Sequence, residues 1–219
     1  MKIVSIISGG LDSVTMLYLL AKEKHSVHSL SFDYGQRHKK ELDYARTASY
    51  DTGGLWDKVD LSTLTKLIGG SALTDDIEVP DGHYAEDSMK ITVVPNRNAI
   101  MLAIAYGVAV AEQADAVAIA VHAGDHFIYP DCRPGFINAF ERMENEAVEG
   151  FGKIELLAPF INSSKSDIVK RGAVINTPFN KTWSCYKGGE IHCGTCGTCV
   201  ERKEAFELAG VKDPTEYLK

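Results

Sequence analysis

Apolar positions along this chain follow two different periods in alternation. Short apolar runs of strand length occupy residues 3–6, 27–32, 58–61, 116–121 and 154–157. Segments with apolar residues at helical spacing lie between and after these runs, at residues 12–24, 37–50, 62–68, 98–111, 133–148 and 165–174. This β–α alternation predicts an α/β fold with a doubly wound, parallel, Rossmann-like sheet, and it places ligands beyond the carboxyl ends of the strands.

Two stretches interrupt the alternation. Residues 70–93 are polar and irregular, and a loop of that length inside a compact domain is more often functional than idle. Beyond residue 180 the chain becomes rich in cysteine and glycine. We therefore expect one compact unit, with a ligand-binding α/β domain over residues 1–180, a substrate loop at about 70–95 and a metal-binding region over residues 181–219. Ser62 is expected to cap the short helix at 62–68.

Composition narrows the classes of partner. The chain has 219 residues and a net charge of −7, and this acidic balance argues against a large nucleic-acid footprint. The apolar stretch 99–111 is too short and too rich in alanine to span a membrane. The apolar run at the N-terminus is too short for a signal peptide. The expectation is a cytoplasmic protein that binds neither membrane nor nucleic acid.

The first strand runs into a glycine-rich loop that opens a helix, with the sequence ISGGLDSVTML at residues 7–17. Free backbone N–H groups and the helix dipole meet an anion at such a place, so it is typical of phosphate binding. Gly9 and Gly10 let the backbone approach a ligand, and Ser8 and Ser13 can add hydroxyl donors. The loop lacks the GK[ST] of a Walker motif and the GxGxxG of a dinucleotide fold. The alternative is an ordinary glycine-rich β–α turn.

Four of the five cysteines crowd into fifteen residues with the spacing C-x7-C-x2-C-x2-C. Four thiolates with glycines between them indicate a structural zinc site, at Cys185, Cys193, Cys196 and Cys199. An iron–sulfur cluster is the competing interpretation, and the absence of a following Cys-Pro counts against it. His192 could replace one thiolate, but we expect it to be a solvated loop residue. The fifth cysteine, Cys132, is expected to be a buried packing residue.

Several polar side chains follow predicted strands on the ligand side. Arg97, at the start of the apolar helix, could hold a carboxylate or phosphate bidentately, and Lys165 could supply a cation for phosphates. Asp125 and Asp131 could hold Mg²⁺ or the donors of a heterocycle, while Tyr129 could stack on a ring. Turn-forming or surface roles are the alternatives. The candidate substrate-binding residues are Tyr34, Gln36, Arg97, Asn98, Asp125, Tyr129, Asp131 and Arg133.

The loop SGGLDS resembles the pyrophosphate-binding loop of the ATP pyrophosphatase (PP-loop) superfamily. With FDYGQRH, VPNRN, YPDCR, SCYKG and CGTCGTC in one order, nearly the whole chain resembles the 7-cyano-7-deazaguanine synthase family. The resemblance implies one zinc on the four cysteines, 7-carboxy-7-deazaguanine and free ammonia as substrates, and a homodimer. It implies that ATP, with Mg²⁺, is bound by Ile7, Ser8, Gly9, Gly10, Leu11, Asp12, Ser13, Val14, Thr15, Met16 and Leu17.

The resemblance also implies a ligase mechanism. ATP would adenylylate the substrate carboxylate, ammonia would displace AMP to give an amide, and a second ATP would dehydrate the amide to a nitrile. The catalytic candidates are Asp12, which would position Mg²⁺, together with Ser13, Arg97 and Lys165.

The sequence departs from the family pattern at three places. Asn96 replaces the glycine of VPGRN, residues 122–128 read HAGDHFI, and Ser184 replaces a threonine. These changes flank the expected substrate pocket, so a relative that stops at the amide or acts on another acceptor stays open. A tRNA thiolase and a zinc-knuckle nucleic-acid binder are more distant alternatives, because the first needs a sulfur-carrying cysteine and both need a basic surface.

Overall fold

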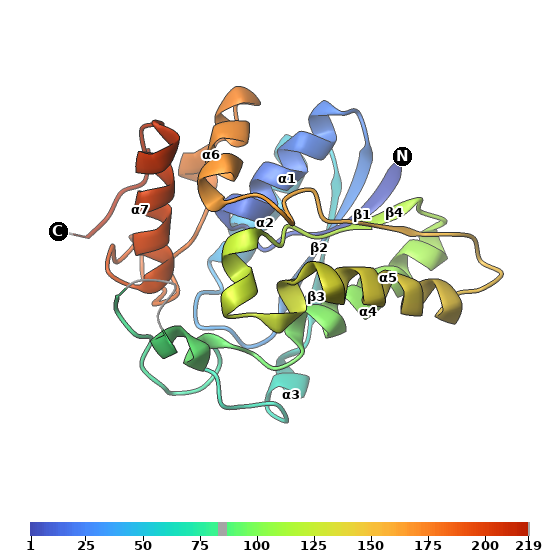
Figure 1. The fold of residues 1–219 in the computed structure, drawn as a ribbon, viewed down its shortest axis with the longest axis horizontal. Helices are drawn as coiled ribbons and strands as arrows, with labels where there is room; N and C mark the ends of the chain where they lie inside the picture. Colours follow the sequence, from blue (N-terminus) through green and yellow to red (C-terminus); the bar gives the residue numbers. More distant parts are fainter. Residues whose placement is uncertain (83–86, 219) are drawn as a thin grey trace.

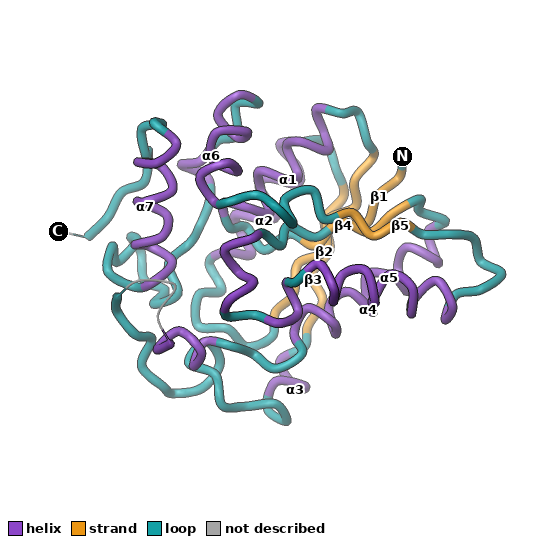
Figure 2. Tube along the Cα trace, in the orientation of Figure 1, coloured by secondary structure: helices purple, strands orange, loops and turns teal. Residues whose placement is uncertain are grey.

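The computed structural model describes residues 1–82 and 87–218 of the chain. Five strands form one sheet in the order β3-β2-β1-β4-β5, with all neighbours parallel. The strands are β1 (Lys2–Ile6), β2 (Ser26–Asp33), β3 (Leu55–Asp60), β4 (Ala116–Ala118) and β5 (Glu155–Leu157). Helices cover both faces of this sheet (Figures 1 and 2). The predicted α/β fold with a doubly wound parallel sheet is confirmed.

Alternate residues of each strand divide the interior into two cores. Val4 and Leu30 face a core closed by α4 and α5, while Ile3 and Val27 face a core closed by α1, α2, α6 and α7. The helices are α1 (Leu11–Lys22), α2 (Glu41–Asp51), α3 (Ser62–Thr65), α4 (Arg97–Glu112), α5 (Pro134–Ala147), α6 (Lys165–Val174) and α7 (Gly197–Ala209). Short 3₁₀ turns are η1 (Asp87–Thr92), η2 (Ala123–Phe127), η3 (Pro130–Cys132) and η4 (Phe179–Lys181).

The strand order reverses next to β1, which pairs with β2 on one side and with β4 on the other. Connections from β1 therefore leave toward one edge of the sheet, and the connection into β4 returns toward the other. Chains that diverge in this way open a crevice at the carboxyl ends of the two central strands. The glycine-rich loop follows β1 directly, so the fold places it in that crevice.

Some predicted boundaries were wrong. The helix expected at 37–50 begins only at Glu41, because residues 37–40 form turns ahead of it. The strand expected at 116–121 ends at Ala118, and Ser62 does not cap α3, whose N-cap is Leu61 with no side-chain hydrogen bond. Helix α7 was not predicted, since its buried face carries the fully buried Arg202 in place of a purely apolar stripe.

One helical run of the described residues, Met89–Glu112, is long and apolar enough to cross a membrane by length and composition alone. Core helices pass the same test. Leu102, Ala105 and Tyr106 of α4 are fully buried in the core against the sheet, so we assign this helix to the interior of the domain.

The C-terminal region is joined to the sheet domain by specific contacts. Phe206 of α7 packs edge-on against Phe179 with ring centroids 5.0 Å apart. The Arg202 guanidinium donates to the Phe179 carbonyl and to the hydroxyls of Thr182 and Ser184. These contacts bring the segment before Cys185 against the rest of the fold, while the boundary at residue 180 stays a prediction.

Candidate active site

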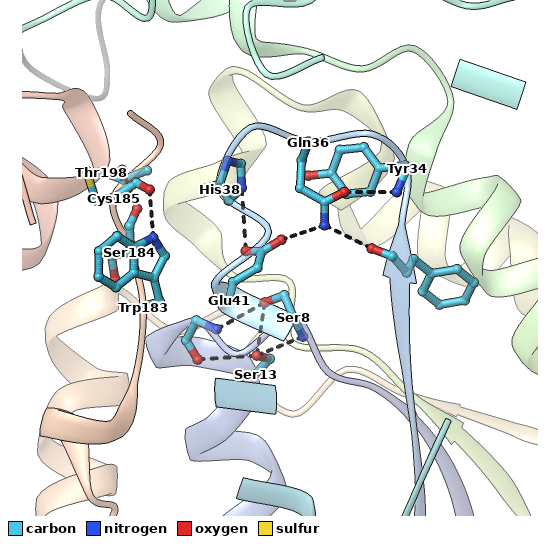
Figure 3. A network of polar contacts seen from close by, with 12 residues as sticks. Ser8, Ser13, Tyr34, Gln36, His38, Glu41, Trp183, Ser184, Cys185 and Thr198 are labelled. Atoms are coloured by element: carbon cyan, nitrogen blue, oxygen red, sulfur yellow. Dashed lines mark hydrogen bonds and ion pairs between the residues drawn. The ribbon is translucent and has the colours of Figure 1, made fainter. Parts of the chain in front are cut away.

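The glycine-rich loop between β1 and α1 is held by its own serines. The Ser8 and Ser13 hydroxyls lie 3.0 Å apart, and Ser13 Oγ donates to the Gly10 carbonyl at 3.2 Å (Figure 3). Gly9 has φ of +88°, and a Cβ there would lie 2.1 Å from the Glu41 carbonyl oxygen. Only glycine allows this close approach of the loop to α2.

The loop forms one wall of a cavity of about 200 Å³. Of the predicted ATP-binding stretch, the residues that line this cavity are Ile7, Ser8, Gly10, Leu11, Asp12 and Ser13. The next four residues, Val14, Thr15, Met16 and Leu17, are buried in α1, where Thr15 Oγ1 donates to the Leu11 carbonyl. This second group lies in the core behind the loop and does not line the cavity.

A cluster of charged side chains meets at the start of α1. Asp12 Oδ2 lies 3.3 Å from Lys165 Nζ, which also contacts Glu201 Oε2 at 2.6 Å. Burial opposes the charge of Lys165, but Asp12, Glu201 and Asp125 raise the pKa of its ammonium above the usual range. The other oxygen of Asp12 is buried without a hydrogen-bond partner among the described residues. An unsatisfied buried carboxylate oxygen fits the Mg²⁺ expected with ATP.

His122 links Asp12 to the segment after β4. Its Nδ1 accepts from the Gly124 N–H at 3.1 Å, so its proton is on Nε2. That nitrogen lies 3.5 Å from Asp125 Oδ2 and 3.8 Å from Asp12 Oδ2. The HAGDHFI segment therefore places a buried imidazole N–H beside two carboxylates of the cavity, and His122 was not among the predicted site residues.

Arg97 also lines the cavity, where it lies among tyrosines. Its Nη1 donates to the Tyr34 hydroxyl at 3.2 Å, and its guanidinium lies 5.4 Å from the Tyr34 ring centroid and 5.9 Å from that of Tyr129. Asn96, just before it, has φ of +59°. Asparagine adopts this left-handed conformation more readily than most residues, and glycine adopts it freely, so this turn accommodates either residue at position 96.

The candidate substrate residues fall into two groups. Tyr34, Arg97, Asn98, Asp125 and Tyr129 line the cavity. The other three have local structural contacts and do not line it: Gln36 bridges Tyr34 N–H and the Phe32 carbonyl, Asp131 accepts from the Asn98 N–H, and Arg133 donates to the His126 carbonyl.

Buried Glu41 and His38 line the cavity between Tyr34 and the glycine-rich loop (Figure 3). Glu41 Oε1 accepts from Gln36 Nε2 at 3.1 Å, and Oε2 lies 3.5 Å from His38 Nε2 (Figure 3). Burial raises the pKa of Glu41 to about 8 and lowers that of His38 to about 4. His38 is therefore neutral near pH 7, and Glu41 is largely protonated there although the positive charge of Arg97 opposes the rise in its pKa.

The four predicted cysteine ligands come together. Their sulfur atoms all lie within 4.8 Å of one another, and Cys193 and Cys199 Sγ are 3.9 Å apart. Tetrahedral zinc–thiolate bonds of about 2.3 Å put sulfurs about 3.8 Å apart, so the set fits one ion. Cys132 is buried at the cavity, as predicted, apart from this set.

The expectation for His192 was wrong, because its side chain is buried and not solvated. Its Nε2 accepts from the Ser184 N–H at 3.1 Å, and its ring lies 4.3 Å from that of Trp183. Burial lowers the pKa of His192 to about 4, which suits a neutral acceptor. His192 thus supports the chain beside the cysteines.

Sequence reasoning missed several cavity residues. His38, Glu41, Trp183 and Tyr186 line the cavity and were not candidates, and Glu201 contacts Lys165 from α7. His38 stands in the FDYGQRH motif and Tyr186 in SCYKG, so a signal existed for both. Glu201 had none, because only the path of α7 brings it to Lys165.

The glycine-rich loop, the switch point and the Asp12–Lys165 pair define an ATP-binding α/β enzyme of the PP-loop class. The fold is similar to U34-tRNA thiolase NcsA from Methanococcus maripaludis, with a TM-score of 0.52 and 15% identity over 94% of this chain and 64% of that one. NMN synthetase from Francisella tularensis also gives 0.52, with 13% identity over 96% and 78% of the two chains. At these identities the likeness shows the fold alone.

The family is shown by sequence. The family model described as queuosine biosynthesis protein QueC matches residues 2–210, and this chain belongs to that family. It is 62% identical to the 7-cyano-7-deazaguanine synthase of Rhizobium rhizogenes, over 99% of this chain and 92% of that protein. The corresponding synthase of Ruegeria pomeroyi is also 62% identical, over 99% and 94% of the two chains.

Proposed function

We propose that this chain converts 7-carboxy-7-deazaguanine, ammonia and ATP to 7-cyano-7-deazaguanine in queuosine biosynthesis. The observation that carries the proposal is that a single cavity joins the loop of Ser8 and Ser13 to the Arg97 corner. A nucleotide phosphate at the loop and a carboxylate near Arg97 would then meet in one cavity, as adenylyl transfer requires.

Different residues of the cavity act on the two reactants of the first half-reaction. The substrate carboxylate oxygen attacks the α-phosphorus of ATP, and the bond to the bridging oxygen of pyrophosphate breaks. The Gly10 N–H, the loop serines and Lys165 stabilise the charge on the leaving pyrophosphate. Asp12 would hold Mg²⁺, which offsets phosphate charge when bound. Arg97 orients the carboxylate for attack.

Ammonia then adds to the acyl-adenylate, loses a proton, and AMP leaves to give the amide. Adenylylation of the amide oxygen by a second ATP releases pyrophosphate, and loss of two protons from the nitrogen together with departure of AMP gives the nitrile. No covalent nucleophile from the chain is needed. Positioning and electrostatic stabilisation supply the rate.

We also infer that the cysteine centre holds zinc. A four-iron cluster places iron and sulfide between its thiolates and spreads them further apart than a single ion does. The spread of at most 4.8 Å supports a single ion. Cys185 lies between Ser184 and Tyr186, which both line the cavity, so the ion would fix this wall. A homodimer, a cytoplasmic location and ammonia as nitrogen donor are carried over from the family resemblance and the composition.

A thiolase chemistry is disfavoured by the state of Cys132. Burial, with the charges of Asp125 and Asp131, raises the pKa of this thiol above its usual range. A thiol that stays protonated is a poor sulfur carrier. An enzyme that stops at the amide uses the same site residues, so the end product is decided by experiment.

The test is to incubate the purified protein with ATP, Mg²⁺, ammonium and 7-carboxy-7-deazaguanine and to follow the base by mass spectrometry. We expect the nitrile, with the amide as a transient species. If only the amide accumulates, the amide is the end product and the nitrile is removed from the proposal. If 7-carboxy-7-deazaguanine is not consumed, the proposed function is overturned. Asp12→Ala should abolish turnover with little change in folding.

A further inference from the structure

We propose that the Glu41 carboxylate binds the 2-aminopyrimidin-4-one edge of the deazapurine, accepting from its ring N–H and its exocyclic amino group. This inference rests on the proposed function, because it assigns the substrate's recognition group within the same cavity. It concerns a residue that the chemistry of adenylylation does not use.

Glu41 is placed to face a ligand. It is the first residue of α2, it lines the cavity, and its side chain is 11% exposed. Within the described part of the chain, no lysine or arginine nitrogen lies within 4.0 Å of its carboxylate; its contact there is His38. Burial raises the pKa of this carboxyl to about 8, so it holds a proton near pH 7 when no ligand is bound. A ligand with paired N–H donors favours the ionised form, and both oxygens then act as acceptors.

The hydrogen-bonding capacity of Glu41 is only partly used. A carboxylate has about four acceptor positions, of which Gln36 takes one at Oε1 and His38 approaches Oε2. Gln36 is itself fixed, because its amide also bonds Tyr34 N–H and the Phe32 carbonyl. This fixed amide orients the carboxylate plane, as Figure 3 shows. Two parallel N–H donors match both oxygens of such a plane.

The surrounding surface suits a planar heterocycle with a carboxylate at its other end. The aromatic side chains of Tyr34, Trp183 and Tyr186 line the same cavity, and aromatic faces stack on rings. Arg97 lies beside the Tyr34 ring and supplies the cation for the substrate carboxylate. Glu41 would therefore bind the N–H edge of the base, and Arg97 would bind its carboxylate. Because these two groups lie at different ends of the substrate, the base can bind in one orientation only.

The test compares two substrates in two enzymes. Wild type and Glu41→Gln are assayed with 7-carboxy-7-deazaguanine and with the analogue that lacks the 2-amino group. We expect wild type to prefer the natural base by about 100-fold or more in kcat/KM, because a site built for an N–H donor rejects its absence. Glu41→Gln should lose at least about tenfold of that preference while KM for ATP stays within about threefold.

Controls separate recognition from structure. Glu41→Asp keeps the acceptor pair and should recover part of the preference that Glu41→Gln loses. Glu144→Gln alters another buried glutamate, on α5 outside the cavity, and should keep the wild-type preference. Equal preference in wild type and Glu41→Gln, with normal turnover in both, would overturn this inference and leave the proposed function intact. A rise in KM for ammonium alone would also overturn it, since Glu41 would then bind the nitrogen donor. Failure of wild type to consume either base would overturn the proposed function itself.

Discussion

Lys165, the first residue of α6, lies 2.6 Å from Glu201 of α7. Both side chains are largely buried, and the lysine also contacts Asp12 in the first turn of α1, next to the glycine-rich loop. Glu201 follows Cys199 by two residues, so the cysteine centre at the start of α7 sets the position of the glutamate. We therefore expect Glu201 to act as a positioning residue, because its contact with Lys165 fixes the ammonium that is proposed to bind the phosphates of ATP.

We expect Glu201→Gln to lower kcat/KM for ATP by roughly 10-fold to 100-fold and to leave KM for the deazapurine nearly unchanged. The reason is that the neutral amide of glutamine no longer holds the ammonium of Lys165 by charge, so the position of this side chain is less well defined. Steady-state kinetics with each substrate varied in turn measure the split. The exposed Glu207→Gln on the same helix is the control. Equal losses for both substrates would indicate a general loss of structure instead.

Removal of the metal should unfold the C-terminal region before the sheet. The four cysteines converge there, and without an ion their thiolates repel one another. The free energy of ion binding therefore contributes directly to the folding of residues 185–199. We expect a chelator to lower the Tm and to abolish ATP turnover, with one equivalent of zinc found per chain by elemental analysis. Visible absorbance typical of iron–sulfur centres in the isolated protein would contradict the zinc assignment.

Local signals predicted what depends on local structure. The strand–glycine–helix pattern located the loop Ser8–Gly9–Gly10 that lies beside the cavity, and the cysteine spacing located the four side chains that come together and could hold a metal ion: Cys185, Cys193, Cys196 and Cys199. Both motifs are built from residues close together in the sequence. The parallel sheet followed from the β–α alternation for the same reason.

The contacts that could not be predicted from the sequence are made by residues far apart along the chain. Glu201 reaches Lys165 across 36 residues, and His192 is buried by Trp183 and Tyr217, which come from separate segments. Polar residues such as these are usually exposed, so composition alone argued against their burial. The helical period of apolar residues predicts which face of α2 is buried, but it does not predict that the Glu41 carboxyl lines a cavity. That placement follows from the packing of α2 in the fold.

Gly9→Ala should destabilise the protein and weaken ATP binding together. The new Cβ would lie 2.1 Å from the Glu41 carbonyl oxygen and 2.9 Å from the Ala45 nitrogen, and φ of +88° is itself costly for alanine. We expect a loss of at least about 2 kcal/mol in the free energy of unfolding, measured in urea. Gly135→Ala in α5 meets no atom within 4 Å and should be neutral or stabilising. Unchanged stability in the Gly9 variant would show that the loop and α2 can separate freely.

The buried Glu41 makes stability depend on pH in a defined window. In the folded state its pKa is about 8, raised by burial against the opposing effects of Gln36 and Arg97, while the unfolded chain titrates near 4.5. Between these values the folded state holds a proton that the unfolded state has lost, so stability falls as pH rises, by at most about 1.4 kcal/mol per pH unit. His38 acts in a lower window, because its pKa is lowered from 6.5 to about 4 and its contribution is lost as pH falls below 6.5. Urea unfolding of wild type and Glu41→Gln between pH 6.5 and 8 therefore isolates the glutamate. We expect wild type to lose stability relative to the variant across this range, and two parallel curves would mean that the carboxylate is already ionised in the folded protein.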